Sequence, residues 1–172
     1  NCIFRNNSSQ ITGSASELFG PGNRAEVRHC LFVDNISNRG LNFISFPKYG
    51  FNEKHGSGAL TVFNGSFIHV ERCTFTGNYN GVDDASRGNT YFDCIFWNNN
   101  ARGGRAPGRR YEMDVRDGSR VANCYFGGNT IHDLRQTISK VQNMLGAPDP
   151  KFDASYNPTN PHYDGVGYRP PE

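Results

Sequence analysis

The sequence predicts an all-β fold, a parallel β-helix, from one recurring pattern and the turn-rich composition around it. The pattern Val-x-x-Cys-x-Phe-x-x-Asn is complete in residues 70–78 and recurs four times, once with Tyr at its first position. All the cysteines of the chain fall at the same motif position: Cys2, Cys30, Cys73, Cys94 and Cys124. Such a repeat indicates a solenoid, in which each coil buries its inner face against its neighbours.

The spacing within the motif predicts the path of each coil. Cys and Phe lie two apart, so they point to the same side of an extended chain. The Val lies three residues before the Cys, which requires a one-residue bend between two short inward-facing pieces. The motif asparagines fall at turns, where we expect a ladder: Asn7, Asn35, Asn78, Asn99 and Asn129.

Composition agrees with a single turn-rich domain and excludes several functions. The chain has 172 residues with 20 glycines and 9 prolines, a balance that argues against a helical bundle. A net charge of +2 is too small to indicate nucleic-acid or membrane-surface binding. No apolar run is long enough to span a membrane.

The repeats resemble a known superfamily. The runs 73–78 and 94–99 are similar to the repeats of right-handed parallel β-helix proteins, the superfamily of pectate lyases and polygalacturonases. Residues 149–153, Asp-Pro-Lys-Phe-Asp, resemble a segment that closes such domains in large secreted bacterial proteins. The resemblance implies right-handed coils and an extracellular, periplasmic or cell-envelope location. It implies no single function, because the superfamily includes lyases, hydrolases, binding modules and structural spacers.

Three segments are expected along the chain. Residues 1–130 form the coils, and because the first repeat is cut, we expect a fragment of a longer chain. Residues 131–146 are expected to form an amphipathic helix that covers the last coil or binds a partner. Its apolar residues have helical spacing: Ile131, Leu134, Ile138, Val141 and Leu145. The Pro- and Tyr-rich residues 147–172 are expected to be a strap along the body or an arm onto a neighbour.

The cysteines are expected to stay reduced inside the solenoid. Equivalent positions of stacked coils have parallel side-chain directions, which suit a disulfide poorly. Buried free thiols behave as small hydrophobes. A metal site would need converging ligands such as Cys-x-x-Cys, and the sequence has none. We therefore expect neither a metal nor a cofactor.

Two weak catalytic candidates accompany the repeats. Residues 81–84, Gly-Val-Asp-Asp, resemble the polygalacturonase Gly-x-Asp-Asp motif, in which carboxylates serve as acid and base. The family's Gly-His-Gly and Arg-Ile-Lys motifs are missing downstream. Asp83 and Asp84 are therefore expected at a solvated corner of their coil. A lyase would instead need an Arg or Lys base with acidic calcium ligands, for which Asp114 and Asp117 with Arg109, Arg110 or Arg116 are candidates.

Two insertions into the repeats, roughly residues 36–57 and 100–110, suggest a binding cleft. Both begin just after a ladder asparagine, so both should leave the same edge of the solenoid. Solvated loops are one reading. The other is a basic, aromatic cleft for an anionic sugar chain or an acidic protein surface. Its candidate binding residues are Lys48, Tyr49, Lys54, His55, Arg102, Arg105, Arg109 and Arg110.

These observations favour a non-catalytic structural or binding module of a larger secreted or cell-envelope protein or complex. Its partners would be an anionic polysaccharide, and the rest of a longer chain or another subunit covering the first coil. The alternative is a polysaccharide lyase or glycoside hydrolase that acts on an acidic polysaccharide.

Overall fold

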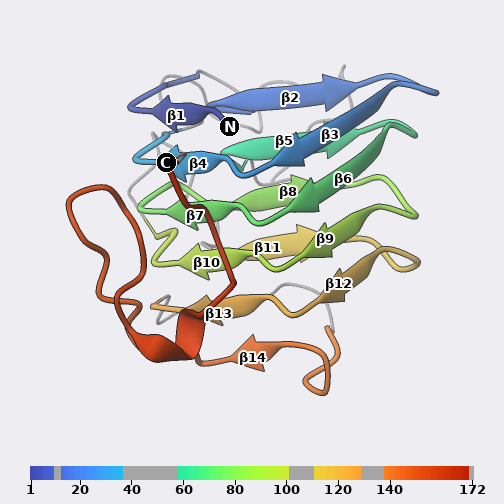
Figure 1. The fold of residues 1–172 in the computed structure, drawn as a ribbon. Helices are drawn as coiled ribbons and strands as arrows, with labels where there is room; N and C mark the ends of the chain where they lie inside the picture. Colours follow the sequence, from blue (N-terminus) through green and yellow to red (C-terminus); the bar gives the residue numbers. More distant parts are fainter. Residues whose placement is uncertain (10–12, 37–57, 101–110, 129–137, 171–172) are drawn as a thin grey trace.

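The chain is a stack of parallel β-coils (Figure 1). The structure is a computed structural model, and it describes residues 1–9, 13–36, 58–100, 111–128 and 138–170. Its strands are β1 (Ile3–Arg5), β2 (Ser16–Phe19), β3 (Arg24–Arg28), β4 (Leu31–Val33), β5 (Leu60–Phe63), β6 (Phe67–Glu71), β7 (Thr74–Thr76), β8 (Val82–Asp84), β9 (Thr90–Phe92), β10 (Ile95–Trp97), β11 (Met113–Val115), β12 (Arg120–Ala122), β13 (Tyr125–Gly127) and β14 (Met144–Leu145), and a 3-10 helix covers Pro161–Tyr163.

Three parallel sheets form the sides of the stack. The first sheet has the order β1-β4-β7-β10-β13-β14, the second β2-β5-β8-β11, and the third β3-β6-β9-β12. Each coil passes through the three sheets in turn, and equivalent residues of successive coils pair in parallel register, as in Ile3 with Leu31 and Val27 with Val70. The predicted parallel β-helix is thus confirmed.

The motif phenylalanines form a continuous stack inside the solenoid. Their ring centroids lie 4.6 Å apart for Phe4–Phe32 and 4.5 Å for Phe32–Phe75. Phe75–Phe96 and Phe96–Phe126 both lie at 4.9 Å, and all four pairs are within 8° of parallel. Aromatic stacking therefore adds to apolar burial at every step between these coils.

The cysteines line the same interior and are unpaired. Four are buried, while Cys2 in the first coil is exposed. Each buried thiol donates to the carbonyl oxygen two residues earlier, as from Cys94 Sγ to Phe92 O at 3.0 Å. Burial raises the pKa of Cys73 and of Cys94 well above the ordinary thiol value. The thiols of Cys73 and Cys94 are therefore weak nucleophiles.

Thiol reactivity should separate Cys2 from the other four. In the native protein we expect about one fast-reacting thiol, because only the thiolate of an accessible cysteine reacts readily. After denaturation without reductant, all five should titrate. Ellman titration measures both states, and a Cys2→Ser variant should abolish the fast native reaction. A denatured count of three or fewer would contradict the reduced ladder.

A left-handed residue makes the bend that the motif predicts before each buried Cys. His29, Arg72, Asp93 and Asn123 have φ between 50° and 53°. A second set of left-handed residues precedes the described ladder asparagines, with φ from 56° at Asn6 to 67° at Gly77. These bends lie at both ends of the first-sheet strands, so each coil turns sharply on either side of its Cys-x-Phe segment.

The helix predicted over 131–146 is wrong for the part that is described. Residues 138–146 form a turn followed by β14, whose Met144 and Leu145 pair with Tyr125 and Phe126. Asn143 takes the Cys position, because its Oδ1 accepts the backbone N–H of Cys124 at 3.0 Å. Pairing with the open edge of β13 thus outweighs the helical spacing, and Val141 is left 96% exposed. The rest of that prediction, residues 131–137, lies outside the described residues.

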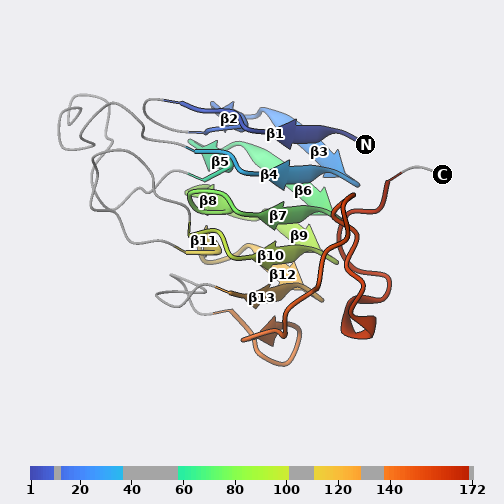
Figure 2. The same ribbon diagram turned by 90° about the vertical axis from the view of Figure 1, so that its left-hand side faces the viewer.

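The C-terminal segment lies along the outer face of the first sheet (Figure 2). Tyr163 and Val166 pack against Ile95, while Tyr168 packs against Leu31 and Val33. The backbone N–H of Tyr168 also donates to Thr74 Oγ1 at 2.9 Å. Of the two expected forms, strap or arm, the described part of this segment is a strap.

Candidate functional site

The sequence-predicted binding residues cannot be placed on the fold. All eight, from Lys48 to Arg110, lie in the ranges 37–57 and 101–110, outside the described residues. The cleft between the two insertions therefore stays a prediction. Arg116 and Asp117 of the lyase alternative are exposed at the turn between β11 and β12.

The Gly-Val-Asp-Asp segment is a strand and not the expected solvated corner. Val82 to Asp84 form β8 in the middle of the second sheet, and both aspartates are only 2% exposed. The parallel pairing of β8 with β5 and β11 fixes this segment as extended chain. Alternation along the strand then places the two carboxylates on opposite sides of the sheet.

Asp84 points into the solenoid and is held there by three donors. It lies in register with Val62 and Val115, both core residues. Its Oδ2 accepts from Asn89 Nδ2 and from Tyr91 Oη, each at 2.8 Å. Its Oδ1 accepts from the backbone N–H of Ser86 at 2.9 Å. Burial raises the pKa of Asp84, although these hydrogen bonds act in the opposite direction.

This raised pKa predicts a pH-dependent difference between the protein and an Asp84→Asn variant. Because the folded pKa exceeds the unfolded one, the folded state binds more protons, and stability falls as pH rises above about 4. The Asp84→Asn variant has no carboxyl group to titrate at this position, so it does not lose stability in this way. Its free energy of unfolding relative to the wild type should therefore increase with pH and then level off. Urea unfolding between about pH 3.5 and pH 7 measures it. A flat difference for Asp84→Asn would contradict the interior assignment.

Asp83 occupies the outer side of the second sheet. It lies in register with Thr61 on β5 and Asp114 on β11. Thr61 and Asp83 are buried, and Asp114 is half-buried. Two carboxylates therefore occupy neighbouring coils on one face, the arrangement that acid–base chemistry on a polymer would require.

The asparagine ladder runs through the described coils. Asn35 Oδ1 accepts from Asn7 Nδ2, Asn78 Oδ1 from Asn35 Nδ2, and Asn99 Oδ1 from Asn78 Nδ2, at 2.7–2.9 Å. The side-chain amides of Asn35, Asn78 and Asn99 also donate to backbone carbonyls of the preceding coil. Asn129 lies outside the described residues.

Glu112 continues this ladder beyond Asn99, which the sequence did not indicate. Its side chain is fully buried, and its Oε1 accepts the backbone N–H of Asn99 at 3.0 Å. Its Oε2 accepts from Asn99 Nδ2. In the sequence, Glu112 is only a polar residue between the inward-facing Tyr111 and Met113. This pattern equally predicts a strand residue that points outward. The carboxylate serves as a ladder acceptor.

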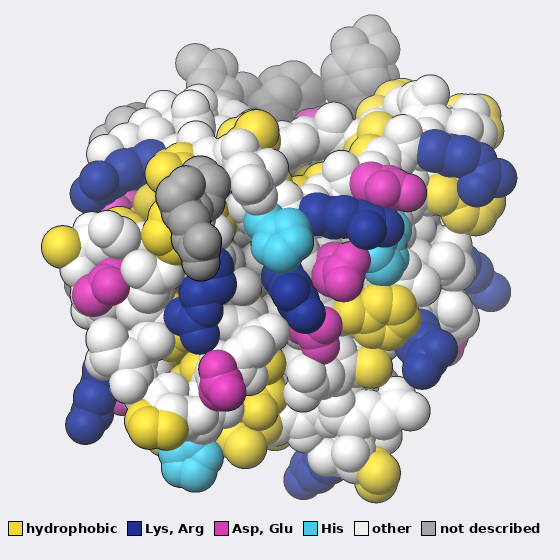
Figure 3. All heavy atoms as spheres, in the orientation of Figure 1, with side chains coloured by type: hydrophobic (Ala, Val, Ile, Leu, Met, Phe, Trp, Pro, Cys, Tyr) yellow, Lys and Arg dark blue, Asp and Glu magenta, His cyan; other side chains and the backbone are white. Residues whose placement is uncertain are grey.

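The outer faces of the three sheets differ in exposure. The first sheet is covered by the C-terminal strap. On the outer side of the second sheet, Thr61 and Asp83 of the two middle strands are buried, Asp114 is half-buried and Glu17 is exposed. The third sheet has exposed or half-buried outer residues along all four strands. Figure 3 shows basic, acidic and histidine side chains interspersed over the side of the molecule on which this sheet lies. The third sheet is therefore the open face of the described solenoid.

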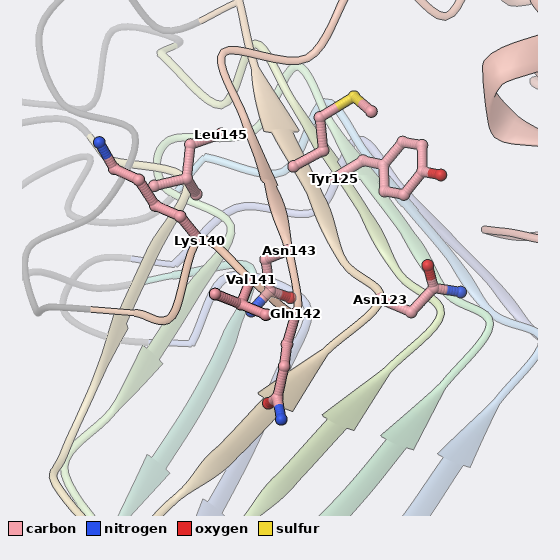
Figure 4. Close-up of a pocket in the computed structure, with 8 residues that line it drawn as sticks. Asn123, Tyr125, Lys140, Val141, Gln142, Asn143 and Leu145 are labelled. Atoms are coloured by element: carbon pink, nitrogen blue, oxygen red, sulfur yellow. The ribbon is translucent and has the colours of Figure 1, made fainter.

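A hollow of about 450 Å³ also lies beside β14 (Figure 4). The labelled side chains of Lys140, Gln142 and Asn123 point in different directions around it. Asn143 is engaged with backbone groups, donating to Val121 O at 2.9 Å. The hollow thus lacks the converging polar groups that mark a ligand site.

Comparisons with known proteins add no family assignment. A scan against protein-family models, a search of curated proteins and a search of solved structures each found no match to this chain. Among the described residues, no cluster of three or more His, Cys, Asp or Glu side chains could hold a metal ion. The same residues contain no helix with the length and apolar character needed to cross a membrane.

Proposed function

We propose that the chain is a non-catalytic structural or binding module of a larger secreted or cell-envelope protein or complex. The interactions of its buried carboxylates and thiols support this proposal. Asp84 and Glu112 accept hydrogen bonds inside the stack, and burial raises the pKa of the Cys73 and Cys94 thiols. Side chains of these types can serve catalysis, but here they form hydrogen bonds within a coil, as Asp84 does, or between coils, as Glu112 does.

The exposed edge of the first coil is the observation that carries the proposal. Each strand of this coil, β1, β2 and β3, pairs on one side only within the described residues. The inward residues of this coil are only partly buried: Phe4, Ala15, Leu18, Ala25 and Val27. Their counterparts in later coils are buried. Ile3 and Phe19 on the same coil are 60% and 57% exposed. An apolar edge with unpaired backbone is a template for another chain. The rest of a longer chain, or another subunit, would cover it.

The test is the mass in solution of residues 1–172 produced alone. We expect self-association or poor solubility, because the uncovered coil is available for pairing. Replacing Ile3 and Phe19 by Lys should restore a soluble monomer. The matched control is Val141→Lys, a similarly exposed apolar residue at the other end of the stack, which should change nothing. Analytical ultracentrifugation distinguishes these outcomes, and a monodisperse wild-type monomer would refute the proposal.

A polysaccharide lyase or glycoside hydrolase is the second candidate. Its support is the register of Asp83 with Asp114 on one face, together with the resemblance to pectate lyases and polygalacturonases. The test is incubation with polygalacturonate and alginate, with reducing ends and unsaturated products followed over time. Depolymerisation that Asp83→Asn abolishes without loss of fold would replace the first proposal with this one.

A further inference from the structure

The first coil, formed by β1, β2 and β3, lies at the top of the stack in Figure 1. Each of its strands pairs on one side only within the described residues. Between the coils below it the same contacts recur, and these contacts have a fixed direction. They therefore determine which groups the open edge of the first coil can still bind.

Each described step of the asparagine ladder has the same donor and the same acceptor. Asn35 Oδ1 accepts the backbone N–H of Asn7 at 3.1 Å and its Nδ2 at 2.9 Å. Asn78 Oδ1 accepts the same two groups of Asn35, both at 2.9 Å. Asn99 Oδ1 accepts those of Asn78 at 3.2 Å and 2.7 Å. The earlier coil donates each time, so the exposed Asn7 presents its Oδ1 to the Asn of a coil above it.

The ladder side chains also fix the backbone path of the coil that precedes them. In Asn35, Asn78 and Asn99, Nδ2 also donates to the carbonyl oxygen of the motif Phe in the preceding coil. Asn78, for example, bridges Phe32 O and the N–H of Asn35, which are three residues apart. Asn7 offers the same bridge to a turn of the same length.

The aromatic stack adds a second requirement. Phe32, Phe75 and Phe96 each have a ring on both sides, at 4.5–4.9 Å, and are fully buried. Phe4 stacks only on Phe32, at 4.6 Å, and is half-buried. An aromatic ring in the incoming coil, three residues before its Asn, would bury the other side of Phe4 and complete the stack.

The backbone of β1 sets the direction of the incoming strand. In each lower step, the residue after the motif Cys donates its N–H to the carbonyl of the Cys position in the preceding coil, except in the last coil, where Asn143 replaces Cys. Leu31 N, for example, lies 2.9 Å from Cys2 O. Ile3 N–H is the equivalent donor on the open edge, so it fits a carbonyl two residues before the incoming Phe. All three requirements match one motif in parallel register.

The other end of this chain does not meet these requirements. Leu145 lies in register with Phe126 and thus takes the Phe position of the last coil. Three residues later, where the motif has Asn, the chain has Pro148, which has no backbone N–H to donate. Within the described residues the second and third sheets end at β11 and β12, so the last coil adds only β14. A second copy stacked head to tail would leave Asn7 without its donors.

We propose that the first coil binds a β-coil that carries the same Cys-x-Phe-x-x-Asn motif, parallel and in register. Its Asn donates to Asn7 Oδ1, its Phe stacks on Phe4, and the carbonyl of its Cys position accepts from Ile3. This inference rests on the proposed function, because it names the partner for the edge that carries that proposal. A strand without the motif pairs its backbone with the edge but completes neither the ladder nor the aromatic stack.

The experiment fuses a copy of residues 73–93 to Cys2 in place of Asn1 and follows the reactivity of the Cys2 thiol. Asp93 of the copy then precedes Cys2 as it precedes Cys94 in the chain. The copied coil is self-contained, because Asp84 finds its donors within residues 86–91. Cys73→Ser in the copy leaves Cys2, exposed in the unfused chain, as the thiol to follow. The copy should slow its reaction with Ellman's reagent at least about tenfold, because a buried thiol is inert.

Variants on both sides of the contact test the role of the motif. Phe75→Ala together with Asn78→Ala in the copy removes the motif side chains and keeps the length of the coil. Asn7→Ala removes the acceptor in the first coil. Each should make Cys2 react at least about tenfold faster than with the intact copy. Arg87→Ala in the copy is the matched control, because Arg87 is exposed, and it should leave Cys2 protected. Circular dichroism confirms that each protein is folded.

Equal protection of Cys2 by the intact copy and by the Phe75→Ala, Asn78→Ala copy would overturn the proposal, because any added coil would then suffice. So would a fast reaction of Cys2 beneath the intact copy. Dilute protein limits self-association, and a second copy that protects the unfused chain as fully as the fusion does would also overturn it. The solution mass of the unfused chain is a separate measurement. An edge that accepts any coil leaves the proposed function in place, whereas a monodisperse unfused monomer refutes that function whatever Cys2 does.

Discussion

Replacing Phe75 by Ala should lower the free energy of unfolding by about 3–5 kcal/mol, the range for a fully buried aromatic residue. Its ring is fully buried and stacks on Phe32 at 4.5 Å and Phe96 at 4.9 Å. Removing it breaks both stacking contacts and leaves a cavity in the middle of the solenoid. Since small domains are stable by only about 5–15 kcal/mol, the variant should be close to unfolding.

Denaturant unfolding followed by circular dichroism measures this effect. Val141→Ala is the control at an exposed apolar residue, because that side chain is 96% exposed and its loss should change stability by less than about 0.5 kcal/mol. A loss below about 1 kcal/mol for Phe75→Ala would show that neighbouring coils collapse into the space.

The second large effect is expected for Asn78→Ala, which should cost about 2–4 kcal/mol. Asn78 Oδ1 accepts the backbone N–H of Asn35 at 2.9 Å, and its Nδ2 donates to Phe32 O at 3.0 Å. Alanine leaves the buried N–H of Asn35 without this acceptor, and Phe32 O and Asn99 Oδ1 each lose a donor. Asn7→Ala is the control from the same ladder, because Asn7 is exposed and its side-chain amide donates to Asn35 Oδ1.

Thermal or denaturant unfolding of the pair tests this difference. Asn7→Ala should cost less than about 1 kcal/mol, since water can satisfy the groups it exposes. Equal costs for the two variants would indicate that water reaches the ladder throughout its length.

The sequence predicts the interior of this fold because the interior repeats. Cys73 lies three residues after Val70 and two before Phe75. In the structure all three face inward, with a left-handed Arg72 at the bend. Each inward position of the coil corresponds to one position of the motif, so the spacing of the motif alone predicts which side chains point inward.

The last coil could not be predicted because it lacks the motif residues. Asn143 and Leu145 replace Cys and Phe, and Leu145 lies in register with Phe126. The spacing of Ile138, Val141 and Leu145 suits a helix equally well. Only the open edge of β13, a feature of the assembled stack, decides between the two.

The open outer face of the third sheet could not be predicted for a different reason. Alternation along β3 and β6 predicts which side chains point outward but not which sheet remains uncovered. That depends on where the C-terminal strap lies, and the strap uses contacts such as Tyr168 with Leu31 that have no local signal. Sequence reasoning instead directed attention to the insertions, whose residues lie outside the described ranges.

The in-register stacking of coils means that the length of this molecule can change only in whole steps. Adjacent coils align Cys with Cys, Phe with Phe and Asn with Asn, whatever the size of the loops between them. The shortest complete coil, residues 73–93, carries every element of that alignment. Duplicating it would lengthen the rod by ~4.8 Å and add one more nearest-neighbour interface without altering the existing ones. The fold can thus act as a spacer whose length is counted in coils.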